Sequence, residues 1–170
     1  MSKIDPIRPV VLVTRATGRS GGSVLRRIRE RGRFSVRAMS RTPDSAVGRA
    51  LAGSGVQVVT GDLDDVEALR NAMAGCYGVV GYVGGDACGR SWQRALNLLD
   101  AGADAGIGYV VIGVCGCSGS TAGAEVARME GYARSVGVPV AFVDCSRQVE
   151  DAGDAVAQAF EERVDAMLRA

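Results

Sequence analysis

The sequence predicts an α/β fold, a single doubly wound parallel sheet of about six strands with helices on both faces. Short runs of β-branched and apolar residues recur along the chain, and each is typical of a strand buried on both faces. Segments with apolar residues at helical spacing separate these runs. The connections are short, and right-handed crossovers between parallel strands then give the doubly wound order.

The first strand and helix enclose the most informative turn of the chain. We expect a strand at residues 10–13 (VVLV) and a helix at residues 21–31. The segment between them is rich in Thr, Gly and Ser. A strand, a glycine turn and a helix in this order direct the N–H groups of the helix N-terminus at an anion, usually a phosphate.

The other elements follow in alternation. Further strands are expected at residues 35–39, 56–60, 79–83, 109–114 and 140–143. Further helices are expected at residues 45–52, from a cap at Asp64 or Asp65 to Met73, at 91–105, from the GCSGST segment to Val136, and at 154–168. In the last helix the spacing predicts one apolar face, formed by Val156, Phe160, Val164 and Met167.

Composition excludes several classes of protein. With a net charge of +1 and 23% charged residues, the chain has no basic excess, and we expect no nucleic-acid partner. No apolar run approaches the roughly 20 residues that span a bilayer, and the N-terminus does not resemble a signal peptide. We therefore expect a soluble, cytoplasmic protein without a membrane partner, folded as one domain over residues 1–170.

The inventory of catalytic side chains is short. The chain has no histidine, and Lys3 is its one lysine. Histidine general-base chemistry, histidine metal ligation and Schiff-base chemistry at an interior lysine are therefore excluded. A general acid or base would have to be Asp, Glu, Tyr or Cys, whereas the many arginines suit phosphate binding.

Three segments together resemble the NmrA-like branch of the atypical short-chain dehydrogenases: VLVTRATGRSGGSVLRRI, SVRAMSRTPDS and GVQVVTGDLDDVEALRNAMAGCYGVV. The similarity continues more weakly through DAGADAGIGYVVIG and GVPVAFV. It implies a Rossmann-like domain that binds NADP(H) or NAD(H). Proteins of this family are reductases of small unsaturated or carbonyl substrates, or redox-sensing regulators without catalysis.

The resemblance implies where the pyrophosphate of the cofactor would lie. Gly18 and Gly21 hold the second and third glycine positions of the family's GxxGxxG turn, and Arg19 and Ser20 stand where the chain would approach the pyrophosphate. The helix that begins near Gly21 adds the positive end of its dipole.

The family resemblance also implies which residues lie near the adenosine of the cofactor. Arg37 and Arg41 match the family's arginines for a ribose 2′-phosphate, and Asp62 and Leu63 match the residues that flank the adenine. A guanidinium pairs with a phosphate through two hydrogen bonds, where a carboxylate would repel it. The cofactor implied is therefore NADP (NADPH) rather than NAD.

Arg15 departs from the family pattern, which has its first glycine there. An arginine at this position would either crowd the pyrophosphate or require a positive φ, which arginine disfavours. Two outcomes are open. Its side chain either points outward and adds a favourable charge, or fills the phosphate site and pairs with a carboxylate such as Asp62.

The catalytic half of the family pattern is also incomplete. None of Tyr77, Tyr82, Tyr109 and Tyr132 begins a Tyr-x-x-x-Lys motif. Val126 and Ala127 stand where the family's lysine would fall, and Asp144 stands where an arginine usually ends the sixth strand. The C-terminal substrate lobe is not in this sequence. We therefore expect no reductase of the usual kind, and we name no catalytic residue.

Four cysteines fall just past the expected ends of the fourth, fifth and sixth strands: Cys88, Cys115, Cys117 and Cys145. Thiols gathered at that edge would bind a soft metal or form a redox-responsive pair. Cysteine also serves simply as a small, semi-apolar residue. A Cys-x-Cys motif without a second spaced pair is a weak metal signal, so we predict no metal site.

Two classes of function remain open. The first is an NADP(H)-binding protein, either a minimal NADP-dependent oxidoreductase or a cofactor sensor. The second is a repurposed domain with impaired cofactor binding, which binds or transforms another small molecule without redox chemistry. The apolar stripe of the last helix leaves room for a homodimer, and its packing onto the sheet explains the stripe equally well.

Overall fold

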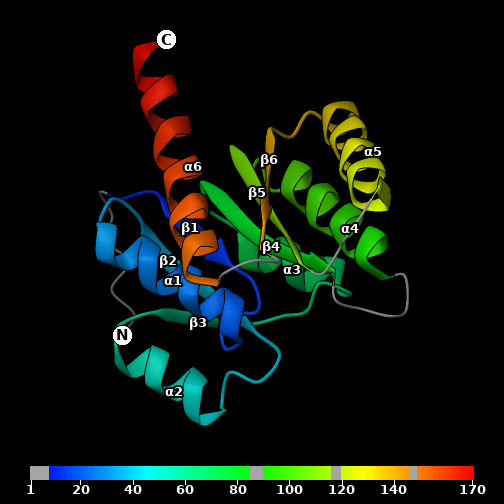
Figure 1. Cartoon of the computed structure of the whole chain (residues 1–170). Coiled ribbons are helices and arrows are strands. Elements are labelled where there is room, and N and C mark those ends of the chain that lie inside the picture. Colours follow the sequence, from blue (N-terminus) through cyan, green and yellow to red (C-terminus); the bar gives the residue numbers. More distant parts are fainter. Residues whose placement is uncertain (1–7, 85–89, 116–119, 146–148) are drawn as a thin grey trace.

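The structure, a computed structural model, describes residues 8–84, 90–115, 120–145 and 149–170. These form a six-stranded parallel sheet of order β3-β2-β1-β4-β5-β6, as Figure 1 shows. The strands are β1 (Val10–Val13), β2 (Ser35–Ser40), β3 (Gln57–Thr60), β4 (Gly78–Gly84), β5 (Tyr109–Cys115) and β6 (Val140–Asp144). The helices are α1 (Arg19–Arg31), α2 (Ala46–Gly53), α3 (Val66–Met73), α4 (Arg90–Asp104), α5 (Ser120–Val136) and α6 (Val149–Arg169). The predicted fold class is confirmed.

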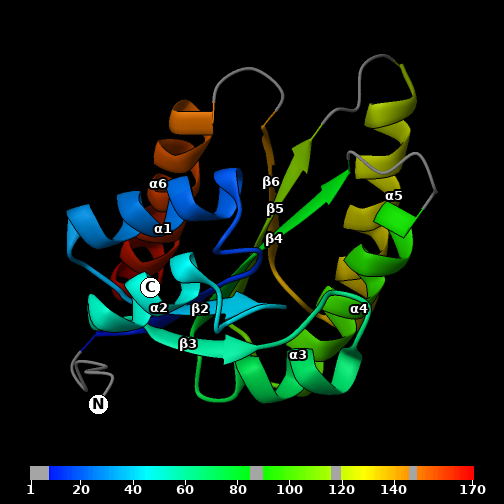
Figure 2. The ribbon, with the colours of Figure 1, turned by 90° about the horizontal axis from the view of Figure 1, so that it is seen from below.

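Helices cover both faces of the sheet (Figure 2). Helices α1 and α6 pack on one face, around a buried cluster that includes Val24, Ile28 and Phe160. Helices α3, α4 and α5 cover the other face, where Leu69 and Leu98 are fully buried. With both faces covered, the central strand β1 consists of four buried apolar residues and shows no polar alternation.

The element boundaries follow local signals where the sequence has them. The Asp65 side chain accepts a hydrogen bond from the Ala68 N–H at 3.0 Å and caps α3, one of the two expected cap positions. Helix α1 begins at Arg19, two residues before the expected start, because Gly18 caps it without a side-chain signal. Helix α6 also begins earlier than expected, at Val149.

The apolar face expected for the last helix is buried along only part of its length. Val156 and Phe160 are fully buried, but the Met167 residue is 55% exposed. The C-terminal end of α6 extends past the sheet (Figure 1), and the Met167 Sδ accepts a hydrogen bond from the Tyr77 hydroxyl at 3.6 Å. Within the described ranges, none of the helices combines the length and the apolar character needed to cross a bilayer.

The turn after β1 brings α1 very close to the sheet. Arg15 takes a left-handed conformation (φ 51°), the positive φ expected there. Its carbonyl oxygen accepts a hydrogen bond from the Gly18 N–H at 2.8 Å. A Cβ atom at Gly21 would lie only 2.3 Å from the same oxygen. Position 21 must therefore be a glycine for α1 to begin where it does.

Two neighbouring glycines of α1 test this close approach. Gly21→Ala should destabilise the protein by about 1–3 kcal/mol, because the new methyl group meets backbone that cannot move aside. Gly22→Ala is the matched control, since a Cβ there has 3.4 Å to its nearest neighbour, the Ala16 carbonyl oxygen. It should be neutral or stabilising by up to about 1 kcal/mol. Urea unfolding of both variants measures this, and equal stabilities would contradict the packing described.

The backbone of Arg15 gives a second prediction. A β-branched residue is strongly disfavoured at positive φ, whereas glycine adopts it freely. Arg15→Val should therefore be less stable than Arg15→Gly by about 1–2 kcal/mol in urea unfolding. If the two variants unfold at the same urea concentration, the turn does not require the left-handed conformation.

Candidate functional site

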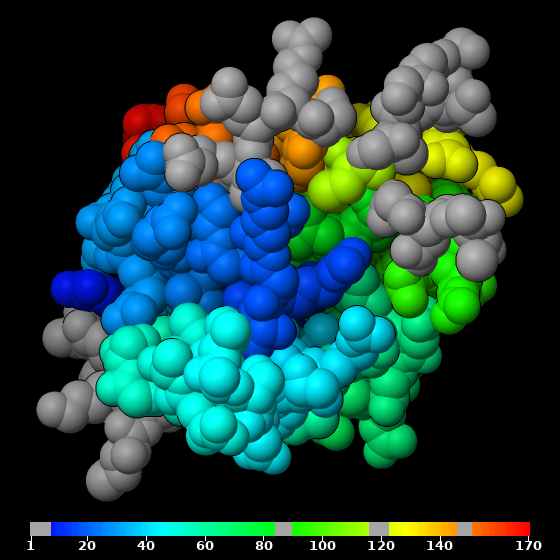
Figure 3. Space-filling view, turned by 60° about the horizontal axis from the view of Figure 1, so that its bottom comes forward, coloured from blue at the N-terminus to red at the C-terminus, as the bar shows by residue number. Residues whose placement is uncertain are grey.

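A cavity of 490 Å³ lies at the carboxyl ends of β1, β2 and β3, beside the strand where the sheet order reverses. Figure 3 views this face: the blue residues of the first turn meet the cyan residues that follow β2. The lining residues are Arg15, Thr17, Gly18, Met39, Ser40, Arg41, Thr42, Gly61, Asp62, Leu63 and Arg94. They include three guanidinium groups and one carboxylate, so the cavity suits an anionic ligand.

The first turn supplies one wall of the cavity. Gly18 caps α1 with no side-chain hydrogen bond, and no acidic residue lies in the first turn of the helix. The first N–H groups of a helix have no partner within it, so this end carries a partial positive charge. The Arg15 side chain is exposed and lines the cavity beside this end of the helix.

The buried hydroxyl of Ser40 joins this turn to the end of β2. The Ser40 Oγ lies 3.1 Å from the Thr17 Oγ1, and it accepts a hydrogen bond from the Thr42 N–H, also at 3.1 Å. In the backbone, the Ala16 N–H donates to the Met39 carbonyl at 3.2 Å. These bonds hold the first two turns together before any ligand binds.

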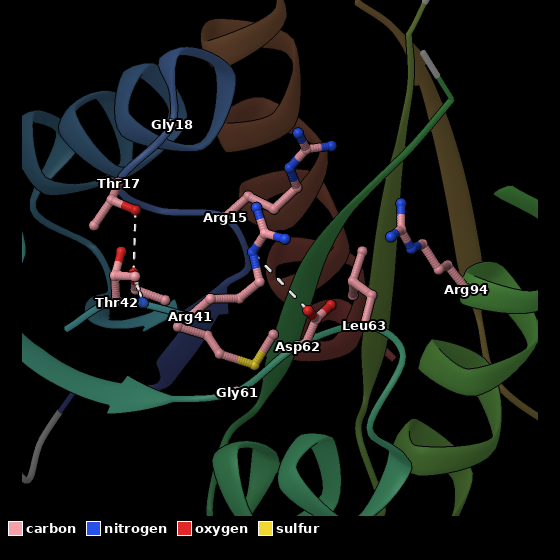
Figure 4. Close-up of a pocket in the computed structure, with 11 residues that line it drawn as sticks. Arg15, Thr17, Gly18, Arg41, Thr42, Gly61, Asp62, Leu63 and Arg94 are labelled. Atoms are coloured by element: carbon pink, nitrogen blue, oxygen red, sulfur yellow. Dashed lines mark hydrogen bonds and ion pairs between the residues drawn. The ribbon is translucent and has the colours of Figure 1, made fainter. Parts of the chain in front are cut away.

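Asp62 pairs with Arg41 and not with Arg15. The Arg41 Nε lies 3.9 Å from an oxygen of Asp62, and both groups lie at the edge of the cavity. Figure 4 shows Arg41 directed at this carboxylate, while Arg15 extends away from it. The expected pairing of Arg15 with Asp62 is therefore absent, and the Arg15 side chain lines the cavity.

Arg37 does not reach the cavity, although we expected it beside the ribose. Its Nη1 donates to the carbonyls of Ala72 and Ala74, at 2.6 and 2.8 Å, and its Nε donates to the Gln57 side chain at 2.7 Å. It thus binds the C-terminal end of α3. Four residues of strand, about 13 Å at 3.3 Å each, separate it from Arg41. We correct this expectation: the structure does not bring Arg37 to the site.

Helix α4 supplies a further wall of the cavity through Arg94, a residue that the sequence analysis did not predict for the site. Arg94 binds both oxygens of Asp64, at 3.0 and 2.9 Å, and this hydrogen-bonded pairing lowers the pKa of the Asp64 carboxyl. The buried Asn97 donates to the Leu63 carbonyl at 2.9 Å. Helix α4 therefore positions the segment that carries Asp62 and Leu63. The available signal was that α4 follows β4, the strand where the sheet order reverses.

The other expected residues lie beside the cavity or farther away. Arg19 is the exposed first residue of α1, and the Ser20 carbonyl accepts a hydrogen bond from the Tyr82 hydroxyl at 3.3 Å. Val126 and Ala127 lie on α5, and the exposed Asp144 ends β6.

The cysteines form no described metal centre. Cys88 and Cys117 fall outside the described residues, while Cys115 and Cys145 lie at the ends of β5 and β6. In the part of the chain that the structure describes, no three His, Cys, Asp or Glu side chains gather to hold a metal ion.

Several known proteins are similar to this chain. The NmrA-like oxidoreductase FrzB of Cladobotryum is 32% identical over 111 residues, 60% of this chain and 32% of that protein. The related hkm9 of Aspergillus hancockii is 30% identical over 108 residues, again 60% and 32%. These alignments span about a third of the length of either relative.

Solved structures show the same fold. The triphenylmethane reductase of Citrobacter, complexed with NADP(H), superposes with a TM-score of 0.67 at 22% identity, over 80% of this chain and 48% of that one. The NADPH-dependent quinone oxidoreductase of Escherichia coli gives 0.66 at 22%, over 79% and 48%. NmrA, a negative transcriptional regulator, gives 0.65 at 22%, over 81% and 45%.

The NmrA-like family matches residues 8–148, most of the chain. This match includes the first turn, the three strands whose ends form the cavity, and the helix that carries Arg94. The chain is a member of the NmrA-like family.

Proposed function

We propose that this chain is a nucleotide-binding domain that takes NADP(H) in the cavity beside α1, with the ribose 2′-phosphate next to Arg41. The observation that carries the proposal is the convergence of an uncapped helix N-terminus and three arginines on one cavity. The named relatives support it, since solved proteins of the same fold are complexes with NADP(H).

The residues present fit such a cofactor. A volume of 490 Å³ lies within the range of about 300–1,000 Å³ that small-ligand sites occupy. Gly21 lets α1 begin close to the turn after β1, since a Cβ there would meet the Arg15 carbonyl oxygen. A pyrophosphate at this end of the helix would meet its first N–H groups. Leu63 offers an apolar wall for the adenine. Arg15 lines the cavity, and its guanidinium adds positive charge there.

Arg41 is the residue that would distinguish NADP from NAD. Its side chain is 73% exposed, so the guanidinium can turn to a ligand at little cost. The Asp62 oxygen, 3.9 Å away, is a weak competitor because an exposed ion pair contributes little. A phosphate on the ribose would replace it with charge-assisted hydrogen bonds.

The titratable side chains of the chain limit the part that it can take in a redox reaction. Bound NADPH would supply a hydride to an acceptor. No histidine or interior lysine is present to move a proton there. The Tyr82 hydroxyl, bonded to the Ser20 carbonyl, is held protonated because burial raises its pKa. These residues bind and orient a cofactor, which suits a cofactor sensor or the cofactor half of an oxidoreductase.

A comparison of two arginines tests the proposal. Arg41→Gln should weaken NADPH binding about tenfold, or about 1.4 kcal/mol, and leave NADH binding nearly unchanged. Arg37→Gln should leave the ratio of the two affinities unchanged and lower the stability by about 1–3 kcal/mol, because it removes donors from the end of α3. Calorimetric titration with both coenzymes, together with urea unfolding, measures these effects.

Two results of these titrations would contradict the proposal. If the wild-type protein binds neither coenzyme, the proposal is wrong. If Arg37→Gln changes the preference and Arg41→Gln does not, the 2′-phosphate site is misplaced.

A further inference from the structure

Two thiols lie side by side at the carboxyl ends of β5 and β6. The strands pair in parallel, with Val114 opposite Asp144, and the Cys145 N–H donates to the Val114 carbonyl at 2.9 Å. Cys115 and Cys145 are the next residues along each strand. Their side chains share a hydrogen bond. Both cysteines are reduced.

The surroundings hold this pair in place on one face of the sheet. A Cβ atom at Gly113 would lie 2.8 Å from the Cys145 Sγ and 2.7 Å from the Tyr82 ring. Glycine at 113 thus leaves the space that the thiol and the ring occupy. Cys145 is buried, whereas Cys115 is half-buried.

The groups around the pair shift the pKa values of the two thiols in opposite directions. A hydrogen bond from Cys145 and the nearby guanidinium of Arg15 lower the pKa of Cys115 to about 7, against the opposing effects of burial and of Asp144. The same hydrogen bond and burial raise the pKa of Cys145. Near neutral pH a substantial fraction of Cys115 is therefore thiolate, while Cys145 keeps the proton that it donates.

We propose that Cys115 and Cys145 form a peroxide-reactive thiol pair, in which Cys115 is the nucleophile and Cys145 the resolving thiol. The Cys115 thiolate attacks one oxygen of a hydroperoxide, the O–O bond breaks, and the other oxygen leaves as water or an alcohol after taking up a proton. Cys115 is oxidised to a sulfenic acid and the peroxide is reduced. The Cys145 thiol then displaces the sulfenic hydroxyl, which leaves as water, and an S–S bond forms.

The register of the strands suits this second step. Opposite residues on neighbouring strands lie about 4.8 Å apart, within the roughly 4.4–6.8 Å range between Cα atoms that a disulfide spans. Little backbone movement is therefore needed. Oxidation would remove the thiolate that faces Arg15, a residue that also lines the cavity. The proposal does not require that the cavity bind a dinucleotide.

Alkylation rates test the reactivity of Cys115. At pH 7, iodoacetamide should modify Cys115 in the intact protein at least about tenfold faster than Cys76, which is buried and whose pKa burial raises. The rate should rise through pH 7. Arg15→Gln should slow it severalfold, and Arg49→Gln, at an exposed position of α2, should leave it unchanged. A rate no faster than that of Cys76 would overturn the proposal.

Peroxide treatment tests the bridge. Trypsin leaves Cys115 and Cys117 in one peptide and Cys145 in another, so matched serine variants must identify the partner. The link to the Cys145 peptide, detected by mass, should survive Cys117→Ser and vanish in Cys115→Ser. In Cys145→Ser, a dimedone adduct should appear on Cys115. Circular dichroism checks that each variant is folded.

Either of two results would overturn the assignment. One is a link that persists in folded Cys115→Ser protein, because Cys117 would then be the partner. The other is wild-type protein that keeps the thiols of Cys115 and Cys145 unchanged in excess peroxide.

Discussion

The close packing of α1 against the turn that follows β1 is the contact on which the rest of the site depends. The turn needs a left-handed residue at Arg15 and a glycine at position 21, where a Cβ would lie 2.3 Å from the Arg15 carbonyl oxygen. These two conditions fix where α1 begins. Its uncapped end then faces the carboxyl ends of β1 and β2, and a bound anion would interact with backbone N–H groups.

Arg15 is the residue at which the first turn of this chain differs from the NmrA-like family pattern. The family pattern has a glycine there, which would supply the same backbone conformation without a side chain. In this chain the side chain leaves the turn at the edge of the cavity and lies near the Cys115 thiol. One guanidinium therefore adds charge to an anion site and stabilises a thiolate. The two proposals concern neighbouring parts of one crevice, and each can fail without the other.

The sequence predicted the sheet well, because strands buried on both faces are continuous apolar runs such as residues 10–13. It predicted the site less well. Arg37 and Arg41 look equivalent in spacing, but hydrogen bonds to Gln57 and to the end of α3 hold the Arg37 side chain away from the cavity. Arg94 reaches the cavity through the packing of α4 beside it, which the local pattern around Arg94 does not show. Met167 follows the helical period and is still largely exposed, because the C-terminal end of α6 extends past the sheet.

Amide NMR spectra of the labelled protein, recorded as NADPH is added, show whether NADPH occupies the cavity between the first turn and the end of β2. We expect the largest shift changes on Gly18, Arg19, Arg41 and Asp62, and we expect them to reach a plateau. Shift changes confined to the ends of β5 and β6, or no change at saturating coenzyme, would contradict this expectation.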